Sequence, residues 1–154
     1  MADPRPDTLH LDDYLPYRLS VASNRVSRLI AKLYQDRFGL SIWQWRVLAI
    51  LGAQTGLTAV QVAKRAAMDK MAVSRAVSAL LARGLVIRRT SKQDARARLL
   101  SLSETGAGIY AEIAPLARQQ EQQLLADFRP EDIAAGTKFL KALEDQAALL
   151  AGDS

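Results

Sequence analysis

The stretch that decides the fold is TAVQVAKRAAMDKMAVSRAVSALLARGLVIRRTSKQDARARLLSLS, residues 58–103. It carries ten basic and two acidic residues, a formal charge of +8 in a chain of 154 residues that totals +5. The rest of the chain therefore sums to −3. Positive charge confined to one segment is typical of a surface that binds duplex DNA. The ten basic residues are Lys64, Arg65, Lys70, Arg75, Arg83, Arg88, Arg89, Lys92, Arg96 and Arg98.

The first half of this stretch predicts two helices joined by a tight turn. Residues 58–61, Thr-Ala-Val-Gln, form a capping box that opens a helix over 58–66. After a turn at 67–68, Asp69 is placed to cap a second helix that runs to Arg83, and Gly84 ends it. These are helix-turn-helix proportions. The side chains expected to pack inward are Val60, Val62 and Ala63 in the first helix and Val73, Val77, Leu80 and Leu81 in the second.

In a helix-turn-helix the second helix enters the major groove by its amino-terminal half. Arg75 could place its guanidinium fork on a guanine edge, and Lys70 and Ser74 could hold phosphates or base edges. The alternative is a solvated basic helix face without a ligand. Subtracting the buried stripe leaves these residues on the open face: Lys70, Met71, Ala72, Ser74, Arg75 and Ser78.

The second half of the stretch predicts a β-hairpin. Residues 85–90 are β-branched and basic, residues 99–102 are a second strand candidate, and the polar segment 91–98 lies between them. Arginine is favoured in a narrow minor groove, so a basic hairpin tip suits contact with that groove or with phosphates. The tip residues with this character are Lys92, Arg96 and Arg98.

Together, these segments resemble the MarR family of bacterial winged-helix regulators. The wing signature is Asp94-Ala95-Arg96 followed by residues 100–103, Leu-Ser-Leu-Ser. The order and spacing of the pieces carry the resemblance, which covers about residues 14–150. The other matching pieces are Trp45-Arg46-Val47-Leu48-Ala49-Ile50-Leu51, Leu57-Thr58-Ala59-Val60-Gln61-Val62-Ala63, Met71-Ala72-Val73-Ser74-Arg75-Ala76-Val77 and Leu80-Leu81-Ala82-Arg83-Gly84-Leu85-Val86.

The resemblance implies a homodimer with two wings that binds an inverted repeat. Ser74 and Arg75 match the recognition-helix readers, and Arg96 matches the wing arginine that enters the minor groove. Asp94 matches the acid that braces it, and an Asp two residues before an Arg in a tight turn can hold the guanidinium by a charge-assisted bond. The residues expected at the DNA interface are Thr58, Lys70, Ser74, Arg75, Ser78, Lys92, Asp94, Arg96 and Arg98.

The predicted fold is mainly α with a small β-hairpin wing: a winged helix-turn-helix lobe over 41–103 and a helical dimerisation domain over 13–38 and 104–151. Residues 1–12 are expected to be a flexible arm. The long flanking helices are apolar-striped, and one lobe of about 60 residues cannot cover them, so pairing with a second copy is expected. The alternative is a monomeric bundle. A capping box at 41–44 opens the helix before the lobe, and Pro115 predicts a kink in the helix after it.

The resemblance also implies a small aromatic or anionic effector between the dimerisation helices and the DNA lobe. Arg18 and Arg46 could bind a carboxylate and the aromatic side chains could stack on a ring, as an aromatic acid or its thioester would require. The alternatives are aromatic residues that belong to the core, an Arg46 salt bridge between helices, and an effector of another class or none. The residues expected near this junction are Tyr14, Tyr17, Arg18, Asn24, Trp43 and Arg46.

The composition argues against an enzyme, a metal site and a cofactor. The chain has no cysteine and one histidine, His10, and it has no phosphate-binding glycine loop. No run approaches the ~20 apolar residues of a membrane span, and residues 1–13 do not have the pattern of a signal peptide, so no membrane partner and a cytoplasmic location are expected. A winged-helix module that binds another protein is the alternative function, although such a module has no need for +8 on its recognition helix and wing.

Overall fold

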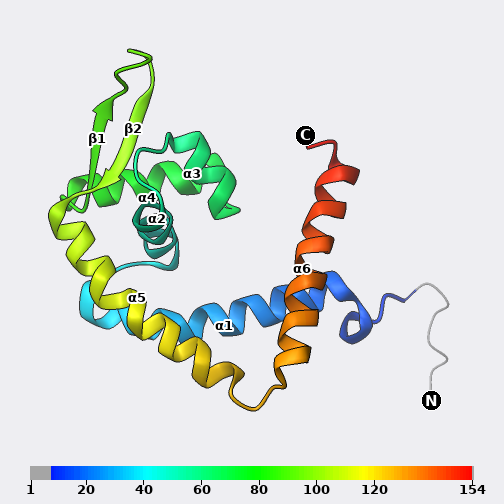
Figure 1. The fold of residues 1–154 in the computed structure, drawn as a ribbon. Helices are drawn as coiled ribbons and strands as arrows, with labels where there is room; N and C mark the ends of the chain where they lie inside the picture. Colours follow the sequence, from blue (N-terminus) through cyan, green and yellow to red (C-terminus); the bar gives the residue numbers. More distant parts are fainter. Residues whose placement is uncertain (1–7, 154) are drawn as a thin grey trace. The chain divides into compact units, whose positions relative to one another are not determined.

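The computed structural model describes residues 8–153 and is mainly helical with one antiparallel hairpin, as the sequence predicts (Figure 1). The elements are the 3₁₀ turn Leu11–Asp13, α1 Leu15–Phe38, α2 Ile42–Ala53, α3 Ala59–Ala66, α4 Lys70–Ala82, β1 Val86–Thr90, β2 Arg98–Leu102, α5 Glu104–Leu125 and α6 Pro130–Ala151.

The predicted helix starts are confirmed by their caps. Ser41 Oγ accepts the Gln44 N–H at 3.1 Å, and Gln44 Oε1 accepts the Ser41 N–H at 3.1 Å. The same reciprocal pair joins Thr58 and Gln61, at 3.2 and 2.9 Å. Asp69 Oδ1 accepts the Ala72 N–H at 2.8 Å. Each cap satisfies amide groups that have no partner inside the first helical turn, so α2, α3 and α4 begin where the sequence places them.

The turn between α3 and α4 depends on Ala67, which ends α3 in the left-handed conformation with φ 51°. Of the residues described, it is the one non-glycine position with positive φ. One prediction for α3 is wrong: Val60 does not pack inward and is 64% exposed. The buried face is formed by Val62, Ala63 and Ala66, and Val60 lies two positions, about 200° around the helix, from Val62.

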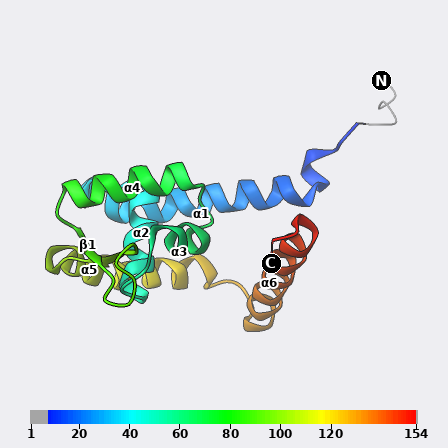
Figure 2. The same ribbon diagram turned by 90° about the horizontal axis from the view of Figure 1, so that it is seen from above.

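The core of the lobe joins α2, α3, α4 and the hairpin to the carboxyl-terminal half of α1 (Figures 1 and 2). From α1, Ala31 and Tyr34 are buried in it. Trp45 of α2 stacks on Tyr34 at 5.6 Å between ring centroids and on Tyr110 of α5 at 6.0 Å. This three-ring stack ties α2 to both long helices. The amino-terminal half of α1 extends away from the lobe and is mostly exposed.

The hairpin pairs β1 and β2 in antiparallel register, from Val86 opposite Leu102 to Thr90 opposite Arg98. The segment before α3 adds an isolated antiparallel β-bridge to the two-stranded sheet, which the sequence does not predict. Leu57 and Leu100 exchange backbone bonds, with N–H to O distances of 3.2 and 2.7 Å. The wing is therefore anchored to the start of the helix-turn-helix as well as to its end.

Helix α5 begins at the base of the wing. Ser103 Oγ donates to the Gly84 carbonyl at 2.6 Å and accepts the Gly106 N–H at 3.0 Å. The helix continues through Pro115 to Leu125. The kink expected near Pro115 stays a prediction.

Backbone contacts divide the chain into a unit that ends at Ala117 and a unit that begins at Arg118. In the second unit, α6 buries none of its residues and leaves Phe139, Leu140, Leu149 and Leu150 exposed. Residues 1–7 of the predicted arm lie outside the described residues. The proposed domain assignment involves a second copy of the chain and stays a prediction.

Candidate nucleic-acid interface

Helix α4 presents a sharply divided surface. Val73, Ala76, Val77 and Leu80 are at most 5% exposed and form its inner face. At 100° per residue, the opposite face is centred on Met71, Arg75 and Ser78, with Lys70 and Ser74 beside it. All five of these side chains are exposed, as the sequence predicts for an open recognition face. Their contact with DNA stays a prediction.

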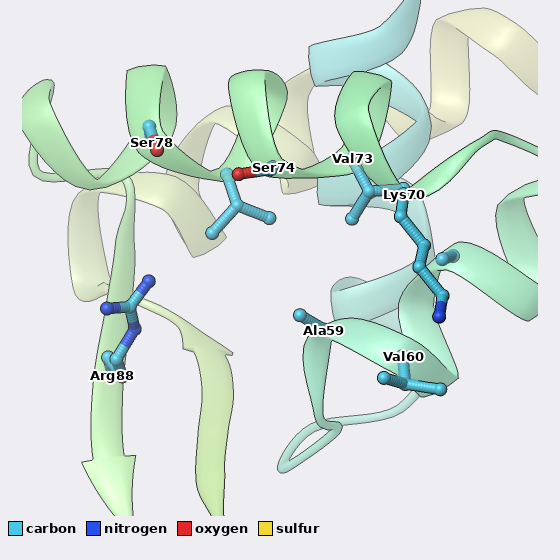
Figure 3. A pocket seen from close by; sticks show the side chains of 9 residues that line it. Ala59, Val60, Lys70, Val73, Ser74, Ser78 and Arg88 are labelled. Atoms are coloured by element: carbon cyan, nitrogen blue, oxygen red, sulfur yellow. The ribbon is translucent and has the colours of Figure 1, made fainter.

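A groove of about 230 Å³ runs along one flank of this face, between α4, the start of α3 and β1 (Figure 3). Its rim carries Lys70, Ser74 and Ser78 from α4, and Arg88 of β1 lies across from the two serines. The sequence did not predict Arg88 at this groove. Strand parity could have found it, because Arg88 lies on the same strand face as Val86, which is buried in the core. The apolar part of the lining is Ala59, Val60, Ala63, Val73 and Val77.

The wing tip is held by its own hydrogen bonds. Ser91 donates its N–H to the Ala97 carbonyl at 3.0 Å and accepts the Gln93 and Asp94 amides on its hydroxyl at 3.2 and 3.3 Å. The predicted bond from Asp94 to the Arg96 guanidinium is wrong. Asp94 Oδ1 instead accepts the backbone N–H of Arg96 at 3.0 Å, because an Asp in a turn reaches the amide two residues on. The exposed guanidinium of Arg96 makes no hydrogen bond or salt bridge with another described residue.

The remaining predicted wing and cap residues have distinct positions. Lys92 is exposed at the tip. Arg98 is the first residue of β2 and not a tip residue, and its guanidinium donates to the Thr90 hydroxyl. The Thr58 oxygen accepts the capping bond of α3, so only its hydroxyl hydrogen is free to contact a phosphate.

The cations of this surface have no carboxylate partners in the part of the chain that the structure describes. Within residues 8–153 the salt bridges are Arg37–Glu112, Arg129–Asp132 and Lys141–Asp145, and none involves the segment 58–103. Arg83 is engaged differently: its guanidinium donates to the Phe38 and Gly39 carbonyls at 2.6 and 3.2 Å. Arg83 therefore links α4 to α1, and the other basic residues of the segment are available to an anionic partner.

The six predicted effector residues do not share one cavity. Tyr14, Tyr17, Arg18 and Asn24 are exposed on the amino-terminal half of α1 or just before it. Trp43 lines a hollow of about 120 Å³ between α2 and α4. A separate cleft, described below, contains Arg46 and none of the other five.

The cleft beside Arg46 lies between α1 and α2 and has a volume of about 190 Å³. Arg46 donates a hydrogen bond of 3.2 Å to the Ala66 carbonyl at the end of α3, and its guanidinium lies 5.4 Å from the centroid of the Trp43 ring. Arg46 therefore links helices through these contacts and not through the salt bridge given above as an alternative. The lining, of which the sequence identified only Arg46, is Ser27, Ile30, Tyr34, Ile42, Trp45, Arg46 and Ala49.

Tyr34 gives this cleft a neutral hydroxyl. Burial raises the pKa of Tyr34 above its ordinary value of 10.0, and the positive charge of Arg46 partly opposes that rise. The hydroxyl makes no hydrogen bond to another described residue, yet the described residues contain no buried side-chain polar atom that lacks a partner. The Tyr34 oxygen is therefore not completely buried, although the residue as a whole is 2% exposed.

Residues 8–153 contain neither a candidate membrane-spanning helix nor a candidate metal-binding cluster. No helix there has the length and hydrophobicity to cross a bilayer. No three His, Cys, Asp or Glu side chains gather in an arrangement that could hold a metal ion.

Comparison with known proteins agrees with this geometry. A model of the MarR family matches residues 38–97. The uncharacterized HTH-type transcriptional regulator YwoH of Bacillus subtilis is 34% identical over 126 residues, which are 80% of this chain and 91% of YwoH.

Two solved structures extend the likeness to the whole fold. A MarR family transcriptional regulator from Silicibacter pomeroyi DSS-3 superimposes with a TM-score of 0.78 at 29% identity, covering 91% of this chain and 99% of its own. BpsR of Bordetella bronchiseptica, whose DNA binding is regulated by 6-hydroxynicotinic acid, has a TM-score of 0.79 at 25% identity. The match covers 90% of this chain and 98% of the BpsR chain.

Proposed function

The chain belongs to the MarR family of transcriptional regulators and is not an enzyme, and from this premise we propose that it is a homodimeric repressor that binds a pseudo-palindromic operator and is released by a small aromatic acid. The partner is double-stranded DNA, which makes the cytoplasm the expected location.

The observation that carries the proposal is the set of unpaired cations on one surface. Lys70 and Arg75 on α4, Arg88 on β1 and Lys92 and Arg96 in the wing are all exposed, and none has a carboxylate partner among residues 8–153. A recognition helix flanked by a wing lets Arg75 reach base edges in the major groove while Arg96 reaches the minor groove or the phosphates. This arrangement supports duplex DNA over a protein partner.

A dimer is supported by apolar surface that the described residues of one chain leave open. Tyr14, Leu15 and Tyr17 at the start of α1 are 38–42% exposed, and the apolar residues of α6 named above are 47–78% exposed. Clusters of this kind mark interaction surfaces in soluble proteins. A two-fold dimer also presents two recognition helices to half-sites about one DNA turn apart, which requires an operator with inverted symmetry.

The cleft between α1 and α2 supports an effector that combines a ring with an acid group. Ile30 and the edge of the Trp45 ring offer apolar contact, because the two faces of Trp45 stack on Tyr34 and Tyr110. Arg46 offers a cation and Tyr34 a neutral hydroxyl. Its volume of about 190 Å³ lies below the roughly 300–1,000 Å³ of sites for drug-sized ligands. A single-ring carboxylic acid therefore fits the cleft better than its bulkier thioester.

The test is a mobility shift on genomic fragments at several salt concentrations, followed by selection of the bound sequences. The proposal predicts a bound fragment with inverted symmetry and an affinity that falls with salt, with a log–log slope of about −0.9 per phosphate contacted. Arg75→Ala should weaken operator binding by about 1–3 kcal/mol and relax base preference at one position in each half-site. Lys138→Ala, which removes the same charge from α6, should leave base preference unchanged.

Binding of a protein partner without any duplex binding at low salt would favour the alternative, an interaction module. The effector is tested separately by thermal shift with benzoic, hydroxybenzoic and nicotinic acids, since a ligand of the folded state raises the melting temperature. An acid that raises the melting temperature of the wild type and of Arg18→Gln, but not of Arg46→Gln, supports the cleft, because Arg18 carries the same charge and does not line it. An acid that stabilises Arg46→Gln equally would place the site elsewhere.

A further inference from the structure

One apolar side chain interrupts the polar face of the recognition helix. Met71 is 66% exposed and is the only large hydrophobic side chain of α4 on the exposed side. It lies opposite the buried stripe, in line with Arg75 and Ser78 at the spacing i, i+4, i+7. Its side chain therefore points in the same direction as the predicted base-reading arginine.

The surroundings of Met71 restrict what can cover it. Lys70 precedes it, Arg75 follows one turn later, and neither forms a salt bridge with a described residue. A surface of this charge favours a polyanion over an apolar protein groove. In the major groove of duplex DNA, the apolar group presented by a base edge is the C5-methyl group of thymine.

We infer that Met71 is a specificity-determining residue that contacts the C5-methyl group of a thymine in each half-site of the operator. The inference rests on the proposed function and assigns a further base contact to the same helix. Residues i and i+4 are about 6 Å apart along a helix, whereas successive base pairs are about 3.4 Å apart. The thymine therefore lies one or two base pairs from the guanine that Arg75 contacts.

The experiment removes the methyl group from the DNA and the thioether from the protein. An operator is first selected from random duplexes with the full-length protein, and each thymine is then replaced in turn by deoxyuridine, which keeps the base pair and lacks the methyl. Affinities are measured for the wild type, Met71→Ala, Met71→Leu and Val60→Ala. Val60 is a matched control because it is 64% exposed and lines the groove beside α4, but belongs to α3 and does not share the face of Met71 and Arg75. Its variant is compared for its response to each deoxyuridine and not for its overall affinity.

Each half-site should contain one thymine whose single replacement by deoxyuridine weakens wild-type binding about three- to fourfold, which is the effect of losing one buried methyl group. With Met71→Ala the same replacement should have no effect, and Met71→Leu should restore it. With Val60→Ala the wild-type sensitivity should remain. If the Met71 thioether contacts the methyl group, the effects of the protein and DNA changes depend on each other. If Met71 only stabilises the helix, the two effects are independent.

Each other outcome overturns the inference in a recognisable way. A methyl contact is excluded if the wild type and Met71→Ala respond equally to every deoxyuridine. It is also excluded if the selected operator has no thymine within two base pairs of the one whose recognition depends on Arg75. Both results leave DNA binding intact. Failure to bind any duplex removes the proposed function itself. Loss of fold in Met71→Ala is detected by its circular dichroism, and Met71→Gln, similar in length but polar, then provides the test in its place.

Discussion

Arg83, at the end of the recognition helix, donates a hydrogen bond of 2.6 Å to the carbonyl of Phe38, the last residue of α1. A second bond of 3.2 Å reaches Gly39. The last carbonyls of a helix have no partner within it and carry partial negative charge, so a guanidinium is well suited to them. Arg83 thus ties the DNA-reading helix to the long helix expected at the dimer interface.

Arg83→Ala should lower the free energy of unfolding by about 1–2 kcal/mol, since two charge-assisted bonds at an exposed site are lost. Arg83→Lys should recover only part of this loss, because an ammonium lacks the planar fork. Urea unfolding measures both. An Arg83→Ala variant with wild-type stability but a shallower salt dependence of DNA binding would show instead that Arg83 contacts phosphate.

Gly106→Ala should destabilise the protein by about 2–3 kcal/mol, because an added Cβ would lie 1.9 Å from the Leu85 carbonyl oxygen and the backbone would have to move. Gly108→Ala, in the same helix with no atom within 4 Å of an added Cβ, should stabilise it by about 0.5–1 kcal/mol. Thermal unfolding of the two variants compares them directly. Equal effects would contradict the close packing of α5 on the base of the wing.

Tyr34→Phe should reduce the loss of stability at alkaline pH. The folded-state pKa of Tyr34 is raised above 10.0, so the folded state binds the proton more tightly than the unfolded state, and stability falls as pH rises from the unfolded towards the folded pKa. Phenylalanine has no proton to lose, and this contribution disappears. Urea unfolding at about pH 8 and about pH 11 measures it. An unchanged difference between the two pH values would mean that Tyr34 is solvated in the folded protein.

Two substitutions of Asp94 should change operator affinity differently. Asp94→Asn keeps an acceptor for the Arg96 amide and removes a negative charge facing DNA, so operator affinity should be equal or higher. Asp94→Ala removes the same charge but also the bond that shapes the turn, so affinity should be lower than for Asp94→Asn. Fluorescence anisotropy with labelled operator separates them. Equal affinity for the two variants would show that the turn does not need this bond.

Arg96→Ala should weaken operator binding while the fold and the dimer remain intact, because the exposed guanidinium makes no salt bridge with the described residues. Anisotropy and gel filtration measure the two properties. A monomeric or unfolded variant would contradict the wing assignment.

Local signals predicted much of the fold. The capping pairs at Ser41 and Thr58 and the Asp69 cap depend on neighbours within a few residues, and all are confirmed. The hairpin followed from its β-branched strands. The prediction that Val60 packs inward is wrong because apolar character alone does not indicate burial at the start of a short helix, where only one helix face contacts the core.

Non-local contacts could not be predicted. Nothing near Leu57 in the sequence indicates that it pairs with Leu100, and nothing near Arg83 indicates the carbonyls of Phe38 and Gly39. The cleft at Arg46 was only partly foreseen, since Tyr34 and Trp45 line it from two helices whose packing decides which residues meet.

The basic segments 58–103 of two chains are proposed to bind one DNA duplex as a symmetric dimer. The most direct measurement is the affinity of the purified full-length protein for its selected operator across a range of salt concentrations, together with the mass of the complex. The account predicts two chains per duplex and a steep loss of affinity with salt that becomes shallower in the Arg96→Ala variant. A single chain that binds no duplex at low ionic strength would contradict it.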